Sequence, residues 1–372
     1  MAYALDKLPL ETLIGPVARA TAVLVRLDER VARSPIRDGL VERQHFADAA
    51  AALWLEGELV HLEDLVLHDA HMDIRTPTHE LTRAHAVLRT RRLIFAQKPD
   101  WALSRDGFLA LTGRGGAMPA ASQKSRDGEG AETASVEADD RDDVEADRLA
   151  EEFAEIDAVL ARSSKILSGA DVPAKAARPD DRPDLIYDLD WNEEERLGEW
   201  QAVLAETRGQ PVVLQAAILL EAWSDIEVLQ HATWLGPLLV AALLRQEGLA
   251  AHHLACIHLG AKNIPRERRR ARSRGDRLLA CLDAIHDAAV AGLKEHDRLV
   301  LAKSQMERRL KQRRASSKLP DLVELVLSRP LVSAGMIQEQ LKVTKQGALN
   351  LIGELGLREM TGRGRFRAWG VI

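Results

Sequence analysis

The chain has 372 residues and a formal net charge of −6, and 46% of its residues are hydrophobic but only 4% aromatic. This length allows two or three domains with a substantial core, and the Ala- and Leu-rich apolar content favours helices over sheets. Two cysteines, Cys256 and Cys281, exclude a disulfide framework. The absence of a secretion signal and of a membrane-spanning apolar stretch predicts a cytoplasmic protein.

The negative charge is concentrated in one segment. Residues 127–147 contain ten acids and one arginine, a local charge of −9. Removing this segment leaves the rest of the chain at about +3. The parts expected to fold are therefore mildly basic, which is compatible with nucleic-acid binding.

The first predicted region, residues 1–112, is helical. Apolar side chains recur at helical spacing, for example at Phe46, Ala49, Leu53 and later Val87. Residues 113–184 change to Gly, Ala, Ser and acidic residues, then to a proline-rich stretch. We expect these residues to form a linker with a short helix near 148–167.

The next predicted region, residues 185–315, is a central helical domain whose most apolar part is 212–220. Two basic stretches occur near its end. Residues 262–277 have eight Lys or Arg against two acids, and residues 303–318 have seven against one. Each stretch is compatible with a path for a phosphate backbone or with a solvated helix face.

Candidate metal and catalytic groups in these two regions are weak. His252 and Cys256, four residues apart, would share a helix face, but no partner cysteine pair is present. A histidine- and acid-rich group at residues 61–71 is more typical of the polar side of a helix. The spacing yields no Ser/His/Asp or Cys/His nucleophile set, so we expect no catalytic residue, no metal and no cofactor.

Residues 316–372 are predicted to form a winged helix-turn-helix. A helix over 319–327 ends at Arg329–Pro330; Ser333 then caps a second helix, 334–341, and Thr344 a third, 345–355. Gly356 is a suitable left-handed cap. The short turn of residues 342–344 is typical of a helix-turn-helix. Two short strands, within 357–361 and 366–372, would flank a Gly/Arg turn as a wing.

The third helix of this module predicts a DNA-reading surface. Ala348, Leu351, Ile352 and Leu355 share its inward face, and the opposite face is expected to contain no acid. Amides there suit adenine, an apolar side chain suits a thymine methyl group, and the basic residues suit phosphates or the minor groove. The expected DNA-binding residues are Thr344, Lys345, Gln346, Gly347, Leu349, Asn350, Arg363, Arg365 and Arg367. The alternative is a winged helix used only for protein contacts or dimerisation.

Three body segments resemble bacterial Fic-type proteins that carry a C-terminal winged helix. Residues 53–65, with Glu56–Gly57, look like the Fic inhibitory helix, although Ala52 stands where Ser or Thr is usual. Residues 235–249 resemble the helix after the Fic active-site loop, and 251–301 the helices that follow. The resemblance implies a metal-dependent nucleotide-transfer site, but its signature is missing. Residues 226–236 contain one histidine, His231, and neither a Gly-Asn-Gly turn nor an arginine.

The whole chain is more specifically similar to an uncharacterised alphaproteobacterial family that joins a domain of unknown function to a helix-turn-helix. The expected fold is mainly α: a helical Fic-like body with a C-terminal winged helix-turn-helix. The expected function is transcriptional regulation through double-stranded DNA, with a homodimer as one possibility and no enzyme activity. Two alternatives stay open: a divergent Fic-type nucleotidyltransferase, and a non-catalytic adaptor that binds a protein or nucleotide.

Overall fold

The computed structural model describes residues 3, 8–72, 76–113, 191–310, 318–361 and 367–371, which belong to one compact unit. The predicted linker from residue 114 on, including the helix expected near 148–167, lies outside the described residues. So does the expected Gly/Arg turn, residues 362–366.

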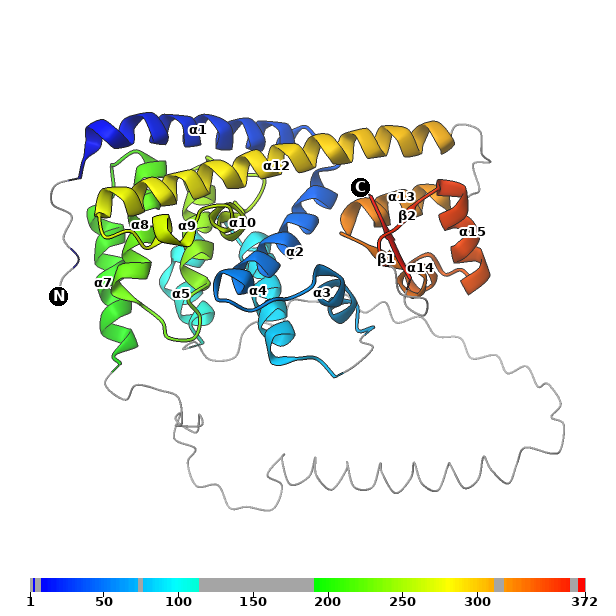
Figure 1. The fold of residues 1–372 in the computed structure, drawn as a ribbon, viewed down its shortest axis with the longest axis horizontal. Coiled ribbons are helices and arrows are strands. Elements are labelled where there is room, and N and C mark those ends of the chain that lie inside the picture. Colours follow the sequence, from blue (N-terminus) through cyan, green and yellow to red (C-terminus); the bar gives the residue numbers. More distant parts are fainter. Residues whose placement is uncertain are drawn as a thin grey trace, which may run out of the picture. The chain divides into compact units, whose positions relative to one another are not determined.

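The fold is mainly α, as predicted (Figure 1). The N-terminal elements are α1 (Leu10–Ala32), α2 (Arg37–Leu55), α3 (Leu62–Asp69), α4 (His79–Ala96), η1 (Trp101–Leu103) and α5 (Arg105–Leu111). The central elements are α7 (Glu193–Glu206), α8 (Val212–Ile226), α9 (Leu235–Gln246), α10 (Ile257–Lys262), α11 (Arg266–Arg269) and α12 (Arg274–Leu310). The C-terminal elements are α13 (Leu319–Ser328), β1 (Val332–Ser333), α14 (Ala334–Leu341), α15 (Lys345–Leu355), β2 (Arg358–Glu359) and β3 (Ala368–Gly370).

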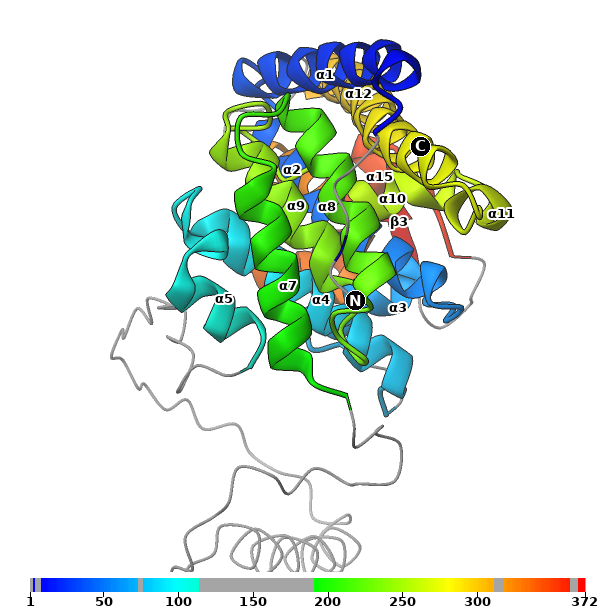
Figure 2. The same cartoon turned by 90° about the vertical axis from the view of Figure 1, so that its left-hand side faces the viewer.

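Helix α12 connects the body to the C-terminal module. Its 37 residues extend about 55 Å at 1.5 Å per residue. It packs along α1 and crosses α8 and α10 before it reaches α13 (Figures 1 and 2). Beneath it, α8 is buried on almost every side, which explains why its sequence is nearly continuously apolar.

Small residues allow α10 to approach α12 closely. A side chain added at Gly260 of α10 would overlap the backbone carbonyl oxygen of Ala284 in α12. Gly292, further along α12, lies close to the side-chain ends of Leu27 of α1 and Gln44 of α2, which have more freedom to move than a backbone carbonyl. The closest backbone approach of the long helix is therefore at Gly260, where only glycine fits.

The three predicted helices of the C-terminal module are confirmed. Ser333 caps α14 by accepting a hydrogen bond from the backbone N–H of Met336 at 3.2 Å. The sheet order is β1-β3-β2, with Val332 opposite Trp369 and Arg358 opposite Gly370, all antiparallel. The two predicted strands are present but shorter than predicted. A third strand, β1, was not predicted, and it pairs with the free edge of β3 opposite β2.

One local prediction is wrong. The segment containing His252 and Cys256 was expected to be helical, but residues 247–256 form turns and extended backbone. Gly248, at φ +77°, ends α9 beyond Gln246, and Cys256 precedes the first residue of α10. The two side chains therefore do not share a helix face.

Candidate nucleic-acid interface

Helix α15 is built by local signals in its sequence. Thr344 caps it by accepting a hydrogen bond from the backbone N–H of Gly347 at 3.1 Å. Ala348, Ile352 and Leu355 are buried in the module, as their spacing predicted, while Leu351 is half-buried. Gly356 ends the helix at φ +63°, a left-handed conformation that glycine adopts without strain.

The outward face of α15 carries the expected polar groups. Lys345, Gln346, Asn350 and Gly353 are exposed. The Nε2 group of Gln346 donates a hydrogen bond to Oδ1 of Asn350 at 3.0 Å, one helical turn away. Gly347 and Leu349 are half-buried beside them, and Thr344 is exposed at the first turn.

The expectation that this face contains no acid is wrong. Glu354 is exposed one turn after Asn350. At 100° per residue, its direction is closer to Asn350 than to the buried stripe. The acid-free part of the face is therefore the first half of the helix, from Lys345 to Asn350.

Lys342 is a basic residue that the sequence reasoning did not assign to the interface. It ends α14 in a left-handed conformation, φ +54°, and is exposed directly before α15. Its position after the last residue of a predicted helix was the available signal, because helices often end in a left-handed residue. The side chain adds a cation close to the first turn of α15.

Only one of the three predicted wing arginines lies in the described residues. Arg367 bonds to the carboxylate of Glu359 on β2, at 2.6 Å from its Nη2, and stacks over the Trp369 ring at 5.3 Å. The hydrogen bond that Arg367 donates to the Glu359 carboxylate raises the pKa of Arg367. Arg363 and Arg365 lie outside the described residues, so their placement stays a prediction.

The C-terminal module is docked on the body through arginines. Arg43 of α2 bonds Glu295 of α12 at 3.0 Å and donates to the backbone carbonyls of Val326 and Arg329 at the end of α13. In turn, Arg329 reaches Asp69 of α3 at 2.7 Å.

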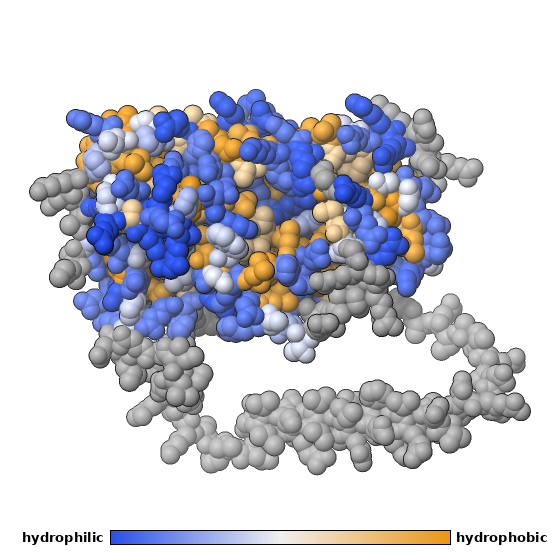
Figure 3. All heavy atoms as spheres, viewed as in Figure 1, coloured by the Kyte–Doolittle hydropathy of each residue, from blue (hydrophilic) through white to orange (hydrophobic). Residues whose placement is uncertain are grey.

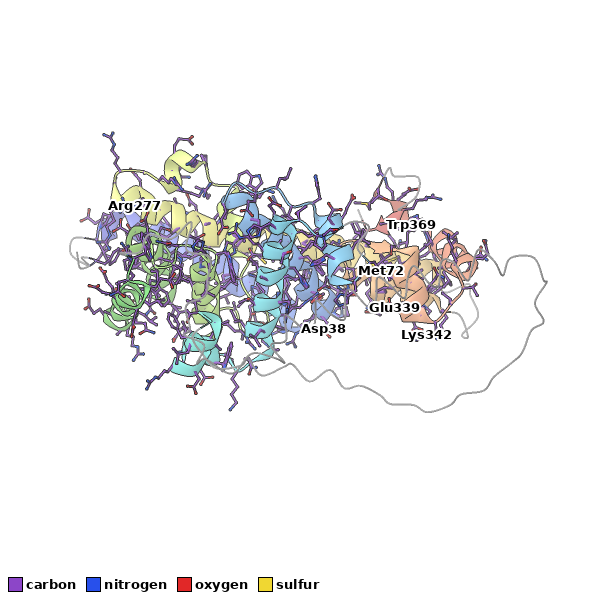
Figure 4. All side chains as sticks on the ribbon, turned by 90° about the horizontal axis from the view of Figure 1, so that it is seen from below. Asp38, Met72, Arg277, Glu339, Lys342 and Trp369 are labelled. Atoms are coloured by element: carbon purple, nitrogen blue, oxygen red, sulfur yellow. The ribbon has the colours of Figure 1, made fainter. Side chains whose placement is uncertain are left out.

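A third arginine secures the other edge of the module. Arg298 of α12 donates to the carbonyl of Val371 at 2.7 Å, beyond β3. The sheet end marked by Trp369 and the turn marked by Lys342 lie at one end of the described unit, and Arg277 lies at the other (Figure 4). The orientation of α15 relative to the body is therefore fixed by named contacts.

The weak metal candidates do not form a site. His252 Nδ1 lies 2.9 Å from Asp28, and the buried Cys256 thiol donates to the carbonyl of Gln44 at 3.6 Å. No group of three or more His, Cys, Asp or Glu side chains in the described ranges could hold a metal ion. Within those same ranges no helix has the length and apolar character needed to cross a membrane.

Of the two basic stretches, 262–277 is the more completely described. Arg268 pairs with Asp283 at 2.7 Å, and Arg277 pairs with Glu221 and Asp225. In the second stretch, Lys303 pairs with Glu324 of α13 at 2.8 Å, and residues 311–317 lie outside the described part. Part of this positive charge is therefore paired inside the protein.

The segment that resembles the Fic inhibitory helix meets the loop in which the Fic signature is missing. Glu56, at the end of α2, accepts a hydrogen bond from the Thr233 hydroxyl and pairs with Arg83. His231, in the same loop as Thr233, is exposed. The contact shows that the segments are neighbours and assigns them no chemistry.

Residues 185–311 match the family described as "Protein of unknown function (DUF1612)", and residues 319–372 match the family described as "HTH DNA binding domain". The chain is 52% identical over 381 residues to the "Uncharacterized protein y4cF" of Sinorhizobium fredii (strain NBRC 101917 / NGR234), and the alignment covers 100% of both chains. These matches confirm a domain of unknown function joined to a helix-turn-helix DNA-binding domain. They do not confirm the Fic resemblance.

Proposed function

Since this chain belongs to the same family as the y4cF protein and ends in a helix-turn-helix DNA-binding domain, we propose that it is a transcriptional regulator. In this role it binds specific sequences of double-stranded DNA. It would therefore act in the cytoplasm, where it meets the chromosome. The observation that supports this function best is the exposed, polar first half of α15 on a fixed helix-turn-helix.

Helix α15 is the proposed recognition helix. Gln346 and Asn350 are exposed, and their side-chain amides can pair with the N6 and N7 groups of adenine in the major groove. Their mutual hydrogen bond orients both amides before DNA arrives. Lys345 and Lys342 flank them and suit the adjacent phosphates.

The β2–β3 hairpin is the proposed wing. Its connecting residues include Arg363 and Arg365, and Arg367 directly precedes β3. Such a basic loop beside a recognition helix can contact phosphates or enter the minor groove. Arg367 is held by Glu359, so we assign it a smaller share of phosphate binding than the other two arginines.

Selection of binding sites from a random duplex library, followed by fluorescence anisotropy on the selected and a scrambled duplex, tests the proposal. Gln346→Ala and Asn350→Ala should each reduce the preference for the selected duplex, by about 1–3 kcal/mol per lost bidentate contact. Arg363→Ala and Arg365→Ala should weaken binding to both duplexes and flatten the salt dependence.

Gln201→Ala is the matched control, since Gln201 is an exposed glutamine on α7 in the body. It should change neither affinity nor preference. If the two α15 variants keep the wild-type preference, α15 does not read the bases. If the full chain selects no sequence, the regulator proposal fails.

We further propose that the regulator acts as a homodimer, which would present two recognition helices one DNA turn apart. Leu10, Ile14 and Val25 form an exposed apolar stripe on α1, and Ile14 is 66% exposed. Ile14→Glu should convert a dimer to a monomer in sedimentation equilibrium without loss of helicity. A wild-type chain that sediments as a monomer at all concentrations contradicts this proposal.

We also propose that the body does not transfer nucleotides. Phosphoryl-type transfer needs an amide cradle and cations around the phosphates. The loop of residues 226–236 supplies no Gly-Asn-Gly turn, and its His231 is not among the residues that line the adjacent cavity. Incubation with labelled ATP, Mg²⁺ and lysate should leave proteins unlabelled. Label transfer that is lost in His231→Ala would favour the enzyme alternative.

A further inference from the structure

The body contains a cavity of about 1200 Å³ at the end of the described unit that carries Arg277 (Figure 4). Its wall comes from five parts of the chain: the end of α2, Trp191 just before α7, the last turns of α8 with the loop that follows and the start of α9, the segment from α10 through α11, and the first turns of α12. No residue of α13, α14 or α15 lines it. The cavity is therefore separate from the proposed DNA-reading surface.

One wall of this cavity is cationic. Lys262, Arg266, Arg269 and Arg270 line it, and none of the four has an ion-pair partner among the residues that the structure describes. Figure 3 shows strongly hydrophilic side chains gathered on this part of the surface, around α11 and the start of α12. Burial lowers the pKa of Arg269, and the neighbouring Arg270 and Arg266 lower it further. The cluster thus holds like charges that repel one another.

The carboxylates that line the cavity do not neutralise this cluster. Glu56 is paired with Arg83, and Asp225 is paired with Arg277. Glu227 is the remaining lining acid, so one further carboxylate stands against four cations in the lining. An anion in the cavity would therefore relieve the repulsion among the arginines.

Another part of the cavity wall is aromatic and apolar, and it adjoins the cationic part at Lys262 and Trp54. Trp54, Trp191, Trp223 and Trp234 line it together with leucine and valine side chains. Trp54 is 40% exposed, and the Lys262 ammonium lies 5.2 Å from its ring centre. Four of the seven tryptophans border this cavity. Trp223 is 4% exposed and Arg196 stacks over the Trp191 ring, so Trp54 and Trp234 supply the accessible aromatic surface for a flat ligand.

Two lining residues retain unsatisfied buried polar atoms. His258 bonds Asp48 through Nδ1 at 2.9 Å, and its Nε2 is buried without a hydrogen-bond partner. The Nε1–H group of Trp191 is also buried without a hydrogen-bond acceptor. Buried polar atoms are nearly always hydrogen-bonded, so these two atoms inside the cavity wall are exceptions.

We propose that this cavity binds a small organic anion with a flat apolar body and a phosphate or carboxylate group. The body lies against the tryptophan wall, and the anionic group accepts hydrogen bonds from Arg266 and Arg270, whose planar guanidinium groups suit both anions. A pocket with an apolar wall and a few convergent charged groups is the usual form of a small-molecule site. Cys281 also lines the cavity, but burial raises its pKa to about 12, so the site is built for binding and has no reactive thiolate.

Isothermal titration calorimetry of the full chain tests this site with four probes: 1-naphthyl phosphate, 1-naphthoate, 1-naphthol and inorganic phosphate. At least one naphthyl anion should bind about tenfold more tightly than naphthol or phosphate alone, because only it engages both walls. The two anions distinguish a phosphate ligand from a carboxylate ligand.

Arg266→Gln and Arg270→Gln should each lower the affinity for the anion by about tenfold, which is the effect of losing one charge-assisted hydrogen bond. Arg268→Gln is the matched control: Arg268 lies on the same helix, is bound to Asp283 and does not line the cavity. The Arg268→Gln variant should bind the naphthyl anion with wild-type affinity. Melting temperatures should show that all three variants fold.

Two results would overturn the proposal: no binding of either naphthyl anion to the folded wild-type chain, or equal loss in Arg268→Gln. A third result would show that residues 262–277 bind nucleic acid at the protein surface. If a short DNA duplex of arbitrary sequence displaces the naphthyl anion, and the same arginine variants abolish that displacement, the stretch serves nucleic acid instead. This test does not depend on sequence-specific DNA binding by α15.

Discussion

Asp28 ties the end of α1 to the turn after α9. Its carboxylate accepts a hydrogen bond from the backbone N–H of His252 at 2.8 Å and contacts the rings of His252 and His253 at 2.9 and 3.0 Å. Burial alone would raise the pKa of Asp28, but these hydrogen bonds outweigh it and lower the pKa to about 2. The charged form is therefore the one that the fold stabilises.

We predict that Asp28 contributes to acid sensitivity. Its folded pKa is below its unfolded value near 4, so its stabilisation is complete above about pH 4 and is lost as the pH falls toward 2. Urea unfolding at pH 6 and at pH 3 measures the effect. Asp28→Asn should be less stable than wild type at pH 6, and the gap should narrow at pH 3. A gap that is constant over this range contradicts the assignment.

For single residues, the sequence predicts contacts between near neighbours along the chain but not contacts between residues far apart in it. Ser333 and Thr344 were identified as helix caps because the donor lies three residues away. Arg43 was not singled out, since its carbonyl partner on Arg329 is 286 residues further along the chain. The same holds for Glu56 and Thr233, whose proximity only the packed fold reveals.

Helices and strands show the same difference between local signals, which the sequence reveals, and distant pairing, which it does not. Amphipathic helices such as α13 and α15 were predicted nearly to the residue, because periodicity and caps are both local. Strand β1 has two residues and no pattern of its own, and it exists through its pairing with β3. The cavity could not be foreseen either, since its wall joins elements far apart in sequence.

Two glycines in helices should respond to alanine in opposite ways. Gly260→Ala places a methyl group where the Ala284 carbonyl oxygen already lies, so α10 must separate from α12. We predict a loss of about 3 kcal/mol in the free energy of unfolding, at the upper end of overpacking costs. Gly198, on the exposed side of α7, has open space around it. Gly198→Ala should raise stability by about 0.5–1 kcal/mol through helix propensity.

Urea titration of both variants checks this pair of predictions. Since the chemical change is identical, the difference between them isolates the α10–α12 contact from the general effect of alanine. Similar stability changes in both variants would show that α10 can move away from α12 at little cost. The α10 end also borders the cavity, so Gly260→Ala should weaken anion binding in parallel.

For the described unit as a whole, body and C-terminal module share one hydrophobic core. Buried residues of α1, α8 and α12 belong to the same cluster as those of α13 to β3. Helix α12 runs from the cavity at Arg277 to the module at Arg298. One continuous helix therefore contacts both the proposed anion site and the C-terminal module.

We predict that Arg43 controls how firmly the module is held. Arg43→Met removes the donor to Val326 and Arg329 and one partner of Glu295, which keeps its bond to Arg298 at 2.6 Å. The free energy of unfolding should fall by about 3 kcal/mol, as for a broken buried pair with one partner retained. Native-state hydrogen exchange should quicken in α13 and α14 and stay unchanged in α8.

Arg30→Met is the control, because Arg30 pairs with Asp297 of α12 at the surface, where both side chains are largely exposed. It should change stability by less than about 1 kcal/mol and leave exchange in α13 unaltered. Equal acceleration in α8 and α13 in the Arg43 variant would mean that the chain opens only as a whole. Faster exchange confined to α13 and α14, together with weaker DNA binding by an intact α15, would show that the body sets the orientation of the recognition helix.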